Sequence, residues 1–165
     1  MISELRRSFL YKKIIPVGVL AIVVIGLIIA TPFLTQKKQS EIPEYNTLIP
    51  NGKSIDDFGG WQRISPPEKE PIFAYVDELD GVIIRVSQQP LPPQFNDGTG
   101  EHVDKLAKEF NATAQLEVGG VILYIGTNAK GPQTVIFTKN NLLVLITSQQ
   151  KIEDQSWTRY ISSLR

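Results

Sequence analysis

One uncharged stretch, from Ile14 to Leu34, constrains the fold of this chain more than any other feature. It reads IIPVGVLAIVVIGLIIATPFL, and the nearest charged residues are Lys13 before it and Lys37 after it. As a helix rising about 1.5 Å per residue it would span roughly 30 Å, the thickness of the hydrocarbon core of a bilayer. Lipid offers no hydrogen-bond partners, and a helix satisfies its own backbone. We therefore predict a transmembrane helix over residues 14–34 that holds the rest of the chain at a membrane.

The charges flanking this stretch predict its orientation. Residues 1–38 carry six basic residues and one acidic residue, a formal charge of +5, whereas the rest carries 11 basic and 16 acidic residues, a formal charge of −5. Four of the six basic residues precede the stretch, and positive residues stay on the cytoplasmic side. We expect a cytoplasmic basic segment over residues 1–13 and an extracytoplasmic C-terminal domain at the plasma membrane.

A cleaved signal peptide is the alternative to an uncleaved signal-anchor. The apolar run is longer than the roughly 7–15 residues of a typical signal peptide, and no A-x-A cleavage site follows it. The sequence therefore favours the anchor and leaves cleavage open. The chain has no cysteine, which excludes a lipoprotein attachment, disulfides, a thiolate metal site and a cysteine nucleophile.

The rest of the chain predicts a short tether and one domain. Residues 35–47 are polar and lack periodicity, so we expect a tether. Residues 48–165 are long enough to bury a self-sufficient core. Their pattern predicts an α+β fold with a mostly antiparallel sheet and two main helices, following the N-terminal transmembrane helix.

Three residue pairs predict two-residue hairpin turns between apolar strands: Asp80-Gly81, Gly119-Gly120 and Asn140-Asn141. The first turn sets a register in which Phe73, Tyr75, Ile84 and Val86 share one face of the sheet. The strand LLVLITS, residues 142–148, is apolar on both faces, which predicts a central strand covered on both sides.

Two amphipathic helices are predicted. One opens at Thr99 or Gly100 and runs through EHVDKLAKEF. The other closes the domain, with Ser148 as its expected N-cap and an apolar packing face of Ile152, Trp157, Tyr160, Ile161 and Leu164. Upstream of the sheet, Ser54 is expected to cap a short turn over residues 55–58, and Trp61 to be a buried structural anchor.

No catalytic, cofactor-binding or metal-ligating residue is predicted, and no cofactor. The chain has a single histidine, His102, so a zinc site lacks its usual ligands. No nucleophile elbow, Walker A or G-x-G-x-x-G sequence occurs. Asp77, Glu78 and Asp80 suggest calcium, but their spacing matches no ligand loop, and we expect a solvated hairpin end. The Asp56/Asp57 pair is likewise expected to be solvated, and we do not expect an enzyme.

The run GPQTVIFTKNNLLVLITSQQKIEDQSWTRYISSL combines a glycine turn, two strands and a terminal amphipathic helix. It resembles uncharacterised single-pass bacterial membrane proteins in which a small exported α+β domain of unknown function follows the anchor. It also looks like the closing hairpin and helix of membrane-anchored domains in some bacterial anti-sigma and lipoprotein-carrier-like proteins. The resemblance implies an exported domain and no catalytic residues.

Two classes of function remain. The first is a binding or assembly module that holds an exported protein, peptide or envelope component near the membrane. The second is a carrier or sensor with an apolar ligand cavity under the sheet, and an envelope enzyme ranks third. The bilayer is the expected partner of residues 14–34, and a mildly acidic domain without a basic stripe is a poor nucleic-acid binder. The sequence does not determine the oligomeric state.

Overall fold

The structure is a computed structural model that describes residues 42–95 and 98–165. The predicted cytoplasmic segment (1–13), the predicted transmembrane helix (14–34) and residues 35–41 of the predicted tether lie outside these residues. No helix within the described ranges is long and apolar enough to cross a membrane.

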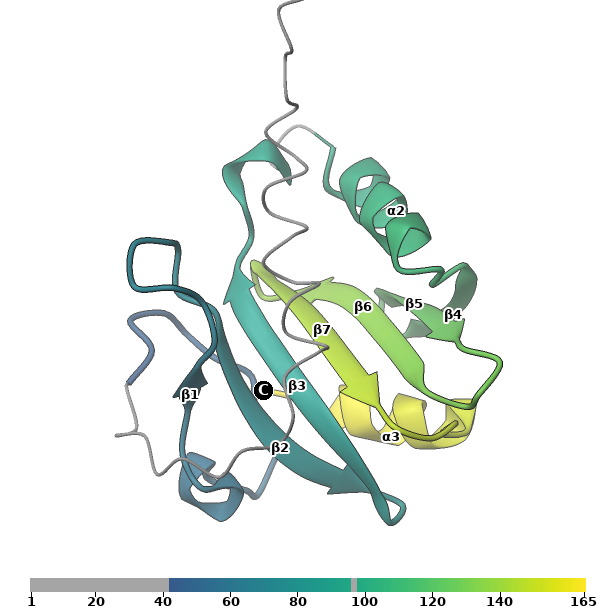
Figure 1. Cartoon of the computed structure of the whole chain (residues 1–165), viewed down its shortest axis with the longest axis horizontal. Coiled ribbons are helices and arrows are strands. Elements are labelled where there is room, and N and C mark those ends of the chain that lie inside the picture. The colour runs from purple at the N-terminus through teal and green to yellow at the C-terminus, as the bar shows by residue number, and fades with distance from the viewer. Residues whose placement is uncertain (1–41, 96–97) are drawn as a thin grey trace, which may run out of the picture. The chain divides into compact units, whose positions relative to one another are not determined.

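The described residues form one antiparallel sheet in the order β1-β2-β3-β7-β6-β5-β4 (Figure 1). A first meander runs through β1 to β3 and a second through β4 to β7, and they join where β3 pairs with β7. The mostly antiparallel α+β fold predicted from the sequence is therefore confirmed. The strands are β1 (Gln62–Arg63), β2 (Phe73–Leu79), β3 (Val82–Pro90), β4 (Ala114–Val118), β5 (Val121–Thr127), β6 (Gln133–Lys139) and β7 (Leu142–Ser148).

Each predicted hairpin turn forms, because the two residues between the strands adopt positive φ. Type I′ turns need positive φ at both central positions, which Gly, Asn and Asp tolerate best. The φ values are 53° and 79° at Asp80-Gly81, 56° and 80° at Gly119-Gly120, and 51° and 60° at Asn140-Asn141.

The two main helices are α2 (Thr99–Glu109) and α3 (Asp154–Ser163), with 3₁₀ turns η1 (Ile55–Phe58) and η2 (Pro93–Phe95). The prediction that Ser148 caps the last helix is wrong. Ser148 ends β7, its hydroxyl donates to the Gln150 carbonyl at 2.7 Å, and Glu153 is the N-cap of α3. Residues 149–150 bend, and the Ile152 backbone N–H donates to the buried Gln133 side chain at 2.7 Å instead of to a helix carbonyl.

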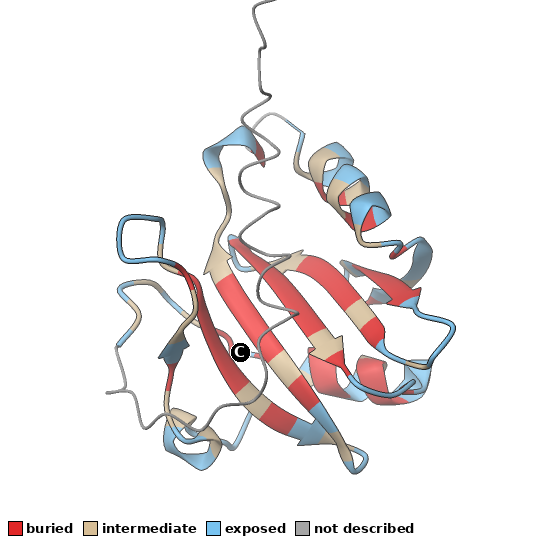
Figure 2. Cartoon of the chain, viewed as in Figure 1, coloured by how far each residue is buried: buried red, intermediate tan, exposed pale blue. Residues whose placement is uncertain are grey.

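One face of the sheet carries the main core, and α3 packs on it. Figure 2 shows buried positions along the central strands and on α3. The whole predicted apolar face of α3 is buried, and Trp157 is fully enclosed. Trp61 is buried in the same core, as predicted. The sheet contributes mainly Phe73, Tyr75, Ile84, Val86, Leu123, Ile125, Val135, Phe137, Val144 and Ile146.

The opposite face of the sheet is covered over β5 and β6 by α2, so the two helices lie on opposite faces (Figure 1). Val103 and Ala107 are the buried residues of α2. At Gly126 of β5 a side chain would bring its Cβ within 2.7 Å of the Asn111 carbonyl oxygen, so only glycine allows this close approach. The predicted central strand is confirmed as β7, whose residues Leu142 to Ile146 are buried on both faces.

The segment that leads into the domain is fastened to β3 and to the C-terminal residues. The Gln88 side chain accepts from the Leu48 N–H at 2.7 Å and donates to the Leu48 carbonyl at 2.6 Å. Ile49 and Arg165 exchange two backbone hydrogen bonds of 3.0 Å. Tyr45, within the expected tether, donates to the Gln88 carbonyl at 2.7 Å, and its burial raises the pKa of its hydroxyl to about 12.

Candidate functional site

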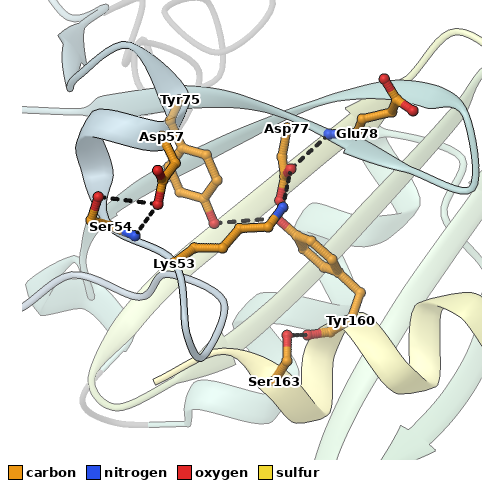
Figure 3. Close-up of polar contacts among 8 residues, drawn as sticks. All are labelled: Lys53, Ser54, Asp57, Tyr75, Asp77, Glu78, Tyr160 and Ser163. Atoms are coloured by element: carbon orange, nitrogen blue, oxygen red, sulfur yellow. Dashed lines mark hydrogen bonds and ion pairs between the residues drawn. The ribbon is translucent and has the colours of Figure 1, made fainter.

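The strongest concentration of polar chemistry surrounds Asp77, near the end of β2. Alternation along the strand places Asp77 on the same face as Phe73 and Tyr75, so its side chain points inward and is only 4% exposed. Its Oδ1 accepts from Lys53 Nζ at 2.8 Å and from the Glu78 backbone N–H at 2.7 Å. Its Oδ2 accepts from the Tyr160 hydroxyl at 3.1 Å (Figure 3). A buried carboxylate is thus surrounded by three donors, one of them cationic.

Two tyrosines extend this network into the core. Because the Tyr160 hydroxyl donates its only proton to Asp77, the Tyr75 hydroxyl, 3.3 Å away, donates to Tyr160. Burial raises the pKa of both tyrosines above the ordinary value, and the nearby Asp77 charge raises it further. Both phenols therefore remain neutral hydrogen-bond donors at physiological pH.

The turn η1 places Lys53 beside this network. The Asp57 carboxylate accepts from the Ser54 backbone N–H at 2.7 Å and from its hydroxyl at 3.1 Å, which lowers the Asp57 pKa. Gly59 ends the turn with φ of 77°, so the predicted short turn after Ser54 is confirmed. The Phe58 ring stacks on Tyr75 at 4.6 Å between centroids, and Lys53 Nζ lies 5.1 Å from the Phe58 ring centroid.

A cleft of about 460 Å³ opens between η1 and the end of the first hairpin. Charged side chains of both signs and a few apolar ones line it, and Ile83 on its wall is 49% exposed. This combination can bind a polar segment and orient it, since an apolar patch with a few fixed charges is typical of binding clefts. The lining residues are Lys53, Asp57, Phe58, Val76, Asp77, Glu78 and Ile83.

A second small cluster joins the tip of the same hairpin to α3. The Asp80 carboxylate accepts a hydrogen bond from the Ser156 hydroxyl and lies 3.5 Å from the Arg159 guanidinium. Arg159 also donates to the Ser156 hydroxyl at 3.0 Å. The Asp80–Arg159 ion pair is exposed and adds little stability by itself. The buried Ser156 hydroxyl joins both side chains and connects the hairpin tip to the helix.

The acidic residues singled out in the sequence do not converge on one point. Asp77 binds Lys53 and Tyr160, whereas Asp80 binds Ser156 and Arg159, so the described residues contain no acidic cluster suited to a metal ion. The expectation of a solvated hairpin end is wrong for Asp77. Its position two residues after Tyr75 was the available signal, because strand alternation assigns it to the core face.

The remaining candidates lie apart from the cleft. His102 on α2 contacts Phe95, with ring centroids 5.3 Å apart. In the Gly98-Thr99-Gly100 sequence the Thr99 hydroxyl donates to the Phe95 carbonyl at 2.8 Å, which anchors the start of α2. Asp56 lies exposed in η1.

Comparison with protein-family models, with curated proteins and with solved structures gives no match to this chain.

Proposed function

We propose that this chain is a single-pass membrane protein, anchored by residues 14–34, that presents residues 48–165 outside the cytoplasm as a binding or assembly module. The anchor is supported by the uncharged stretch and its basic N-terminal flank. The observation that carries the binding role is the cleft beside β2, where fixed charges and exposed apolar surface lie together.

The packing of the core supports a binding module over a carrier with a cavity under the sheet. Trp157 and Ile161 of α3 and Phe137 of β6 are almost completely enclosed by their neighbours. Side chains therefore fill the space between α3 and the sheet where an apolar ligand would have to enter.

The bonding of Asp77 supports binding over catalysis. A general base needs a free lone pair directed at its substrate. Here Lys53, Tyr160 and the Glu78 N–H donate to three of the roughly four acceptor sites of the carboxylate, which thereby links the segment before η1 and the helix α3 to β2.

Site-specific photocrosslinking of the full chain in its native membrane tests this function. A photoreactive residue replaces Ile83 on the wall of the cleft, and matched variants carry it at Ile122 and Lys69, which are exposed elsewhere on the domain. We expect a discrete protein or peptide adduct, identified by mass spectrometry, at Ile83 and at neither control position. Absence of adducts at all three positions would contradict the binding role.

A further inference from the structure

Within residues 42–95 and 98–165, the outer edge of β2 is paired with another strand over only a short part of its length. β1 pairs with β2 only through Gln62 with Ala74 and Arg63 with Phe73. Among the described residues no strand pairs with the outer edge from Tyr75 to Leu79, and η1 faces that edge across the cleft. An uncovered edge presents unpaired backbone groups, which natural proteins usually blunt or use for strand addition.

Strand alternation shows which backbone groups face outward. The Ile64 N–H donates to the Ile72 carbonyl at 2.9 Å, so the backbone of Ile72, and with it that of Ala74, Val76 and Glu78, faces the outer edge. The Glu78 N–H is already bonded to Asp77 Oδ1 at 2.7 Å. An incoming strand would therefore use both backbone groups of Val76 and the carbonyl of Glu78, which fixes its register.

The charge on the cleft walls selects the side chain that fits. Lys53 and Asp77 neutralise each other at 2.8 Å. The Asp57 carboxylate is bonded to Ser54, whereas the Glu78 carboxylate is exposed and points away from Asp57 (Figure 3), and the Phe58 ring and Ile83 supply apolar surface. A segment with one lysine or arginine flanked by β-branched residues complements this lining.

We infer that the outer edge of β2 binds an extended segment of a partner protein by strand addition, with a basic side chain of that segment paired with the exposed Glu78 carboxylate. The inference rests on the proposed binding function and names the chemistry of its partner. A second copy of this chain fits less well, because pairing two β2 edges would bring two acidic strands together.

The probe is a short peptide of alternating threonine and valine with a central arginine, added to the isotope-labelled full chain in lipid nanodiscs. Two control peptides are compared with it. One carries glutamate in place of arginine, and the other is N-methylated at every second amide, which blocks strand pairing. We expect the largest changes in amide chemical shift at Val76 and Glu78. Each control peptide should bind about tenfold or more weakly than the arginine peptide.

Two variants locate the contact on the protein. Val76→Pro removes the outward N–H without removing a bond between β2 and β3, since proline is tolerated at such edge positions. Glu78→Lys reverses the wall charge, and Glu117→Lys makes the same change on β4 at the opposite edge of the sheet. We expect Val76→Pro and Glu78→Lys to weaken arginine-peptide binding several-fold, and Glu117→Lys to leave it unchanged. If the proline variant fails to fold, the Glu78→Lys variant and the N-methylated control peptide still test the inference.

Equal binding of the three peptides, or amide shifts centred away from β2, would overturn the inference. So would sedimentation showing a dimer that Val76→Pro dissociates, because the edge would then be occupied by a second copy. If photocrosslinking identifies a partner while the peptides leave β2 unperturbed, strand addition is wrong and the binding function stands. If photocrosslinking yields no adduct at any position, the binding function is contradicted, and so is this inference.

Discussion

At the scale of single residues, two buried glutamines fasten the irregular segments of the domain to the sheet. Gln88 on β3 holds both backbone groups of Leu48. Gln133 on β6 accepts from the Ile152 N–H at 2.7 Å and from the Trp157 indole at 3.2 Å. Each glutamine side chain bonds to backbone groups that have no partner in a β-ladder. Such bonds are needed because buried backbone groups must be paired.

We predict that Gln88→Leu destabilises the domain strongly. Leucine has a similar volume but leaves the buried N–H and carbonyl of Leu48 unpaired, at about 1–3 kcal/mol for each group. Chemical denaturation of the full chain measures this loss. Gln89→Leu is the matched control, since Gln89 points to the opposite face of β3. Similar stability of the two variants would contradict the role given to Gln88.

Lys53 and Asp77 should be energetically coupled. Removing Lys53 alone leaves the buried Asp77 carboxylate without its cationic partner. Removing both charged groups leaves no unpaired charge in the core. In a double-mutant cycle of Lys53→Met and Asp77→Asn we expect a coupling energy of about 1 kcal/mol or more. Additive effects within experimental error would show that the ion pair contributes nothing to holding η1 against β2.

Three raised tyrosine pKa values predict alkaline destabilisation. The pKa of Tyr45, Tyr75 and Tyr160 lies above the ordinary value of 10 in the folded state, because burial disfavours the phenolate. The folded state therefore binds more protons above pH 10, and stability falls as pH rises from there. Burial lowers the pKa of Lys139, which gives the opposite trend, but only below about pH 10.5.

The expected measurement is a decline in the free energy of unfolding between pH 10 and about pH 12. Tyr45→Phe should make this decline shallower by up to about 1.4 kcal/mol per pH unit, the value for one proton. A slope that is unchanged in Tyr45→Phe would show that Tyr45 does not keep its proton in this range.

At the scale of elements, α3 is a structural part of the domain. Trp157 and Ile161 are enclosed in the core, and burying such side chains contributes about 1.5–3 kcal/mol each. Lys139 donates to the carbonyls of Ile161 at 3.1 Å and Leu164 at 2.7 Å, which pairs the end of the helix. A domain holds only about 5–15 kcal/mol in total.

We therefore predict that deleting residues 152–165 unfolds the domain. Thermal melts with and without these residues test it, and Trp157→Ala should cost about 3–5 kcal/mol while Gln155→Ala, on the exposed side, should cost little. The rival prediction, that this helix docks on a partner or on the membrane surface, would be supported by an unchanged, cooperative melt after deletion.

At the scale of the whole molecule, the orientation across the membrane is the open prediction. The basic residues before residue 14 favour a cytoplasmic N-terminus and an extracytoplasmic domain. Protease added to intact spheroplasts should digest a tag placed after Arg165, and a tag placed before Met1 should resist. A resistant C-terminal tag would reverse the orientation and remove the exported partners considered above.

Local patterns in the sequence determined the elements and their faces. The three turn pairs fixed the hairpins because few residues tolerate positive φ, and strand alternation then assigned Phe73 and Tyr75 to the core. The apolar spacing in the last segment likewise identified the buried face of α3, since a helix has a fixed period. These properties depend on neighbours a few residues apart.

Only the tertiary structure decided how distant segments meet. Asp77 is held by Lys53, 24 residues before it, and by Tyr160, 83 residues after it, and no local pattern encodes either contact. The start of α3 was mispredicted for the same reason, because the Ile152 N–H bonds to the side chain of Gln133, 19 residues earlier, instead of to a helix carbonyl. The cleft itself exists because β3 pairs with β7 and leaves β2 near the edge of the sheet, with only the short β1 beyond it, and that strand order follows from burial of the whole core.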